Sequence, residues 1–171
     1  LEALSDKIEL LKDSFKGEDC YVVTCGPSLG EFDKKELKEK LKDKLVFTVK
    51  QAYDLLPELS AFHFFNSNNF TPQDVGKYRP ITFASSGEAE EVMKAAVWQN
   101  QPYDFFLRVH DGRMHYDHEK ASLAYQLEFD KWTFDKSYDR PWGPGVMYEV
   151  VFYLAHHLGV SNIYTIGWDL E

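Results

Sequence analysis

Residues 20–30 read Cys-Tyr-Val-Val-Thr-Cys-Gly-Pro-Ser-Leu-Gly, and this stretch decides the fold. It joins a short apolar run, rich in residues that favour strands, to a turn that contains two glycines and a proline. The run lacks apolar–polar alternation, which is typical of a strand buried on both faces of a parallel sheet. The stretch therefore predicts a central strand with a tight turn at its carboxyl end.

The same alternation of strand, loop and helix recurs along the chain. Apolar runs predict further strands at residues 45–49, 61–65, 80–84, 105–109 and 162–166. Helical patterns occupy residues 1–16, a segment that starts near Asp33, and residues 52–56, 88–98, 121–129 and 145–158. No stretch rich in Gly, Ser or Pro divides the chain. We therefore expect one α/β domain over residues 1–171, with a Rossmann-like, mainly parallel sheet flanked by helices.

Composition excludes several classes of protein. None of the apolar runs reaches the ~18 residues of a transmembrane helix, and an aromatic content of 16% is too high for a disordered chain. The chain has 28 acidic against 19 basic residues, so a nucleic-acid partner is not expected. An extended run would hold Cys20 and Cys25 too far apart to form a disulfide. They predict two buried thiols and a cytoplasmic location.

The turn after the first predicted strand is the first candidate binding site, because parallel sheets bind ligands beyond the carboxyl ends of their strands. Gly26 would let the backbone approach a ligand closely, Pro27 stiffens the turn, and Ser28 offers a hydroxyl group. The turn is neither a Walker loop nor a dinucleotide-binding glycine motif. A plain tight turn without a ligand remains the alternative.

A second candidate precedes the helix at residues 145–158. Arg140, Gly143, Pro144 and Gly145 form a rigid segment before its first turn. Helix N-termini attract phosphate and carboxylate groups, and an arginine side chain can add a bidentate contact to either anion. The alternative is a loop that only connects to a buried helix.

Histidines offer a third candidate. His110, His115 and His118 lie close together in sequence, but no ligand set of known spacing accompanies them, so a solvated loop is favoured over a metal site. His63 is interpreted as a core residue, and His156 and His157 as structural residues in the last turn of a helix. We expect no metal and no cofactor.

Five stretches together resemble a known family. They are, in chain order, Cys25-Gly26-Pro27-Ser28-Leu29, Lys50-Gln51, Phe65-Asn66, Pro144-Gly145-Val146 and Gly167-Trp168-Asp169. Their order and spacing resemble those of the bacterial lipooligosaccharide sialyltransferases, which transfer sialic acid from CMP-sialic acid to a sugar hydroxyl group. The resemblance covers most of residues 19–169, although residues 70–135 do not align. The same first loop occurs in motility accessory factor glycosyltransferases.

The resemblance implies a domain that binds a CMP-activated acidic sugar and passes it to a glycan acceptor without a metal. With the residues proposed above, the expected donor-binding set is Gly26, Pro27, Ser28, Lys50, Gln51, Asn66, Arg140, Gly143, Pro144, Gly145 and Asp169. Gly26, Pro27 and Ser28 would lie around the phosphate, and Gln51 and Asn66 on the ribose or the sugar. Three positions depart from the family: Cys25 and Lys50 stand where it has Asn, and Pro144 where it has Ser. Lys50 could instead face a phosphate or carboxylate, which leaves CMP-Kdo open as the donor.

Two other functions stay open: a non-catalytic module that binds a nucleotide or sugar, and a pterin pyrophosphokinase with a related domain. The kinase needs an Asp-x-Asp cluster after a strand, whereas residues 66–69 read Asn-Ser-Asn-Asn. In the sialyltransferases the catalytic His and Tyr residues follow the Gly-x-Asp motif. We therefore expect the chain to be part of a longer enzyme and assign no catalytic residue. The acceptor, the oligomeric state and peripheral membrane association through missing segments are left open.

Overall fold

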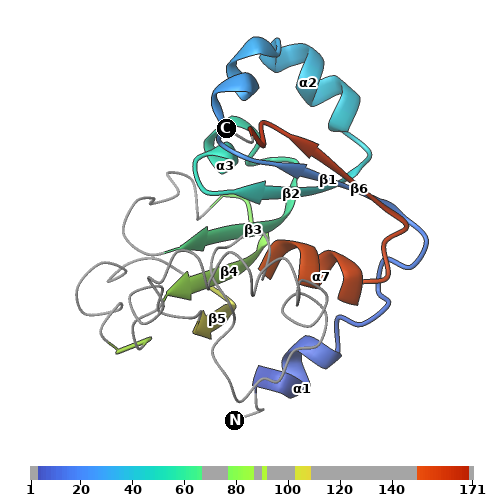
Figure 1. The fold of residues 1–171 in the computed structure, drawn as a ribbon, viewed down its shortest axis with the longest axis vertical. Helices are drawn as coiled ribbons and strands as arrows, with labels where there is room; N and C mark the ends of the chain where they lie inside the picture. Colours follow the sequence, from blue (N-terminus) through green and yellow to red (C-terminus); the bar gives the residue numbers. More distant parts are fainter. Residues whose placement is uncertain (1–3, 67–76, 87–89, 92–102, 109–149, 170–171) are drawn as a thin grey trace, which may run out of the picture.

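The computed structural model describes residues 4–66, 77–86, 90–91, 103–108 and 150–169. Their strands are β1 (Asp19–Val23), β2 (Leu45–Val49), β3 (Ser60–Asn66), β4 (Ile81–Ser86), β5 (Phe105–Arg108) and β6 (Asn162–Ile166). They form one sheet in the order β5-β4-β3-β2-β1-β6, and every neighbouring pair is parallel (Figure 1). The fold is therefore α/β and Rossmann-like, as the sequence predicts.

Helices cover both faces of this sheet. The α-helices are α1 (Leu4–Glu9), α2 (Lys34–Leu41), α3 (Ala52–Leu55) and α7 (Phe152–His157), and η1 (Pro27–Glu31) is a short 3-10 helix after β1. Side chains of α1 and α7 share one hydrophobic cluster with β1 to β5, and those of α2 and α3 share another with β1 and β2 (Figure 1). Two-sided burial explains the unbroken apolar runs, since all five residues of β2 are buried. None of the helices in the described residues is long and apolar enough to cross a membrane.

The start of α2 follows from its sequence. Asp33 is its N-cap, and the Asp33 side chain accepts a hydrogen bond of 2.8 Å from the backbone N–H of Glu36. Leu37 and Leu41 lie one turn apart and are buried against the sheet. The predicted helix start near Asp33 is thereby confirmed.

The prediction of a helix over residues 1–16 is wrong in its length. The helix ends at Glu9, and the backbone N–H groups of Asp13, Phe15 and Gly17 then donate to the carbonyl groups of residues 157–159. The apolar spacing continues past Glu9 because Leu11 and Phe15 also pack against the core, but they do so from a non-helical segment.

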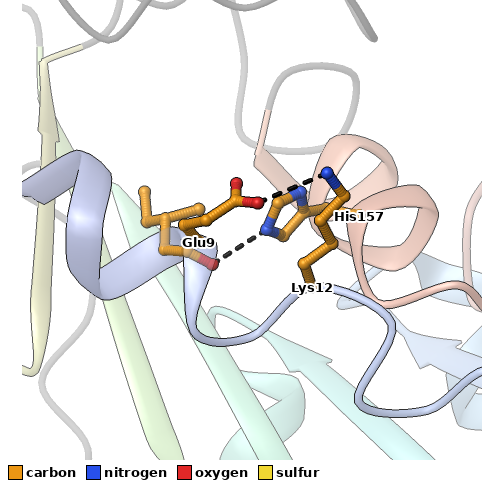
Figure 2. Close-up of polar contacts among 4 residues, drawn as sticks. Glu9, Lys12 and His157 are labelled. Carbon is orange, nitrogen blue, oxygen red and sulfur yellow. Dashed lines mark hydrogen bonds and ion pairs between the residues drawn. The ribbon is translucent and has the colours of Figure 1, made fainter.

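Side chains also join the N-terminal segment to α7. Nε2 of His157 donates to the carbonyl oxygen of Ile8 over 2.8 Å, and Lys12 pairs with Glu9 at 3.3 Å beside it (Figure 2). Ile8 itself is fully buried in the core cluster that contains α7. His157 thus has the structural role that its position in the last turn of a helix predicts.

Cysteine burial differs from the prediction at one position. Cys20 is buried, and burial raises the pKa of its thiol to about 12. Cys25 is exposed because it lies beyond the end of β1, so the prediction of two buried thiols is wrong there. The helices predicted at residues 88–98 and 121–129, and the first turn of the one at 145–158, lie largely or wholly outside the described residues.

His63 is a buried core residue, as predicted. Its Nδ1 lies 3.2 Å from the Thr48 hydroxyl oxygen and 3.3 Å from the Thr48 carbonyl oxygen, and its ring packs against Tyr53. Burial lowers the pKa of His63 to about 4, although the hydrogen bond with the Thr48 carbonyl partly opposes that change.

This burial predicts a pH dependence of stability. Above pH 6.5 His63 is neutral in both the folded and the unfolded chain. Below pH 6.5 His63 becomes protonated in the unfolded chain, whereas in the folded chain it stays neutral down to about pH 4. Between these pH values His63 should remove about 3 kcal/mol of the free energy of unfolding. In urea titrations, the free energy of unfolding of the His63→Phe variant should fall less steeply between pH 6.5 and pH 4 than that of the wild-type chain. The exposed His156→Gln variant should keep the wild-type slope; a His63→Phe profile parallel to the wild-type one would contradict the prediction.

Candidate functional site

The carboxyl ends of β1, β2, β3 and β6 meet at one edge of the sheet, because all of its strands are parallel. Three of the predicted segments follow them: Gly26–Ser28 after β1, Lys50–Gln51 after β2, and Gly167–Asp169 after β6. Asn66 is the last residue of β3. The fold therefore gathers seven of the predicted site residues at a single edge.

The loops after β1 and β6 continue the hydrogen bonding of their strands. The N–H of Thr24 donates to the Ile166 carbonyl oxygen and the N–H of Gly26 to that of Gly167, each over 2.8 Å. A Cβ atom on Gly26 would overlap the Gly167 carbonyl oxygen and lie only 3.0 Å from Cγ of Asp169. Gly167 has a φ of +72°, which only glycine adopts without strain. Both glycines are thus required where the two loops touch.

Ser28 and Asp169 form the polar centre of this contact. The backbone N–H of Ser28 donates to Oδ2 of Asp169 over 2.9 Å, and the Ser28 hydroxyl group donates to Oδ1. These two hydrogen bonds lower the pKa of the exposed Asp169 carboxyl group. The edge therefore carries a carboxylate that is held in one position by two donors.

Thr24 was not among the site residues that the sequence predicts. It is buried at the end of β1, and its hydroxyl group donates to the carbonyl oxygen of Gly167 and lies 3.3 Å from that of Ile166. It thus fixes the carbonyl group that also accepts from Gly26. A lone hydroxyl residue after an apolar run was the available signal, and it is too common to be decisive.

Lys50 follows β2 in an unusual backbone conformation. Its φ is +53°, its N–H donates to the Phe64 carbonyl oxygen over 2.8 Å, and its own carbonyl accepts from Tyr53. Gln51 is exposed at the N-cap of α3, and Asn66 pairs in register with Ser85 of β4. The half-buried Lys50 brings a positive charge to the same edge as Asp169.

The remaining predicted residues fall outside the described part of the chain. They are Arg140, Gly143, Pro144 and Gly145, together with His110, His115 and His118. Within the described residues, no group of three His, Cys, Asp or Glu side chains is arranged to hold a metal ion.

This arrangement suits the binding of a polar ligand. An ordered carboxylate accepts hydrogen bonds from hydroxyl or amino groups, and a lysine ammonium group attracts phosphate or carboxylate groups. No protein-family model and no curated protein matches the chain. The resemblance to sialyltransferases accordingly stays a prediction that rests on its own motifs.

The close approach at Gly26 can be tested with a matched pair of glycines. Gly26→Ala should lower the free energy of unfolding by about 1–3 kcal/mol, because its methyl group would overlap backbone and carboxylate atoms. Gly30 lies in the same loop, and a methyl group added there would meet nothing within 4 Å, so Gly30→Ala should change stability little. Equal urea midpoints for the two variants would show that the loops do not touch as described.

The contact between Ser28 and Asp169 predicts a change in titration. Ser28→Ala removes the hydroxyl donor, so the pKa of Asp169 should rise toward its ordinary value. Carboxyl-detected NMR over an acid titration measures that pKa directly. Ser161→Ala, at an exposed position before β6, is the control and should leave it unchanged. An unaltered Asp169 titration in Ser28→Ala would exclude the hydrogen bond from the Ser28 hydroxyl group.

Proposed function

We propose that the chain binds a CMP-activated acidic sugar at the carboxyl edge of its sheet and provides the donor-binding domain of a glycosyltransferase. The acceptor would be a glycan hydroxyl group. The donor would lie across the loops that follow β1, β2, β3 and β6.

One observation carries this proposal: two of the five stretches behind the resemblance are in direct contact. Gly26-Pro27-Ser28 and Gly167-Trp168-Asp169 lie about 140 residues apart in sequence, yet Ser28 bonds to Asp169 and Gly26 to Gly167. A shared site gives a physical reason for both motifs to occur in one chain. The parallel sheet supports the proposal further, since such sheets bind nucleotides at this edge.

The composition of the edge also supports a sugar nucleotide. The polar residues that the sequence predicts there are Ser28, Lys50, Gln51, Asn66 and Asp169, a set with one charge of each sign. Sugars and ribose are bound through hydroxyl groups, and the linking phosphate needs a cation or backbone donors. No described residue is assigned to the transfer step itself.

Calorimetric titration with CMP, CDP, ATP and a pterin tests the proposal. We expect heat of binding with CMP, and with CMP-sugars at higher affinity, but weaker binding of ATP and the pterin. No heat with CMP at millimolar concentration would overturn the proposal, and preference for ATP plus the pterin would favour a pyrophosphokinase.

Two asparagine variants locate the binding. Asn66→Ala should weaken CMP binding by roughly 1 kcal/mol through loss of a hydrogen bond. Asn162→Ala is the matched control, because Asn162 begins β6 at the opposite edge and bonds Asp19 over 2.7 Å. Equal affinities for the two variants, with intact folds, would remove Asn66 from the site.

A further inference from the structure

Lys50 occupies a strained conformation at the edge proposed to bind the donor. Only Asp13 and Lys50 among the described non-glycine residues have a positive φ, of +56° and +53°. Asp and Asn tolerate this left-handed region through their short polar side chains, whereas for lysine it is uncommon. Strained residues that persist in a folded chain concentrate at ligand sites. The strain therefore marks Lys50 for a role that glycine or asparagine would not supply.

The loop after β1 is a poor place for an anion. Its Ser28 N–H and hydroxyl groups, the donors that a phosphate would need, both bond to the Asp169 carboxylate. A phosphate at that point would have to displace this carboxylate or lie against its negative charge, and the two like charges repel each other. The sequence-based prediction that Gly26, Pro27 and Ser28 surround the phosphate conflicts with this geometry.

Sheet order sets the spacing of the strands that precede Lys50 and Asp169. β6, β1 and β2 are consecutive neighbours, so the loops after β6 and β2 are separated by two strand spacings, or about 10 Å. A ligand that contacts both residues must carry hydroxyl groups at one end and an anionic group at the other. A nucleoside monophosphate linked to an acidic sugar has both kinds of group over such a span.

We propose that Lys50 is the anion-binding and specificity-determining residue of this edge, while the Ser28–Asp169 pair receives hydroxyl groups of the same ligand. This inference rests on the proposed function and deepens it. The phosphate or sugar carboxylate lies at the end of β2, and the hydroxyl-bearing part lies over the loops of β1 and β6. Backbone strain at residue 50 is retained because the side chain that causes it binds the ligand.

Thermal unfolding tests the strain independently of any ligand. Lys50→Gly should raise the unfolding midpoint by about 2 °C, because glycine adopts a positive φ freely. Asp13→Gly provides the matched control: it relieves a positive φ in the segment that pairs with residues 157–159, ahead of the amino ends of β1 and β6 and so at the opposite end of these strands from the site. A Lys50→Gly midpoint at or below the wild-type midpoint would overturn the strain argument.

Binding of CMP and of cytidine, which lacks the phosphate, tests the ligand orientation. Lys50→Gly should weaken CMP binding about tenfold and leave cytidine binding unchanged, while Lys50→Arg keeps most of the CMP affinity. Asp13→Gly should bind both ligands as the wild-type chain does. Asp169→Asn should weaken CMP and cytidine by the same factor, since it alters a contact with hydroxyl groups.

Each other outcome has a definite meaning. If Lys50→Gly binds CMP as tightly as the wild-type chain, Lys50 does not receive the anion and the inference falls, while the proposed function stands. If Asp169→Asn binds CMP more tightly relative to cytidine, the phosphate lies on the β1 loop and the inference falls. If the wild-type chain binds neither CMP, CMP-sugars nor cytidine, both the inference and the proposed function are overturned.

Discussion

The hydrogen bond from Gly26 N–H to the Gly167 carbonyl oxygen is the constraint on which the candidate site depends. It extends the pairing of β1 and β6 beyond the ends of both strands and leaves no space for a side chain at residue 26. The Thr24 hydroxyl group donates to the same carbonyl oxygen, and Ser28 and Asp169 join the two loops by a further hydrogen bond. The backbone contact brings the two loops together, and the side chains of Ser28 and Asp169 then bond across them.

Much of the fold follows from local sequence. β2 and β6 begin and end where their apolar runs do, and the cap at Asp33 sets the start of α2. The helix predicted over residues 1–16 fails at Glu9 because long-range partners decide that segment: residues 157–159 offer carbonyl groups that a sequence window cannot reveal. The predicted burial of Cys25 is wrong for a related reason. An apolar run does not show at which residue the strand ends, and Cys25 lies beyond that end.

The candidate site was predictable as a place but not as a set of contacts. Loop composition and the rule for parallel sheets identify the edge and its residues. The bond between Ser28 and Asp169 joins positions 141 residues apart, so no local pattern contains it. The positive φ of Lys50 is also invisible in sequence, because the residue type itself argues against that conformation. These two facts turn a set of polar residues into an orientation for a ligand.

The position of β1 between β2 and β6 has a consequence for the order of folding. One side of β1 can pair as soon as residues 45–49 exist, whereas its other side waits for residues 162–166. During synthesis one edge of β1 therefore stays unpaired until residues 162–166 have left the ribosome. Closing a loop of that length is slow compared with local helix formation. Within the sheet, the candidate edge is consequently among the last parts to assemble, although β1 precedes the other strands in the chain.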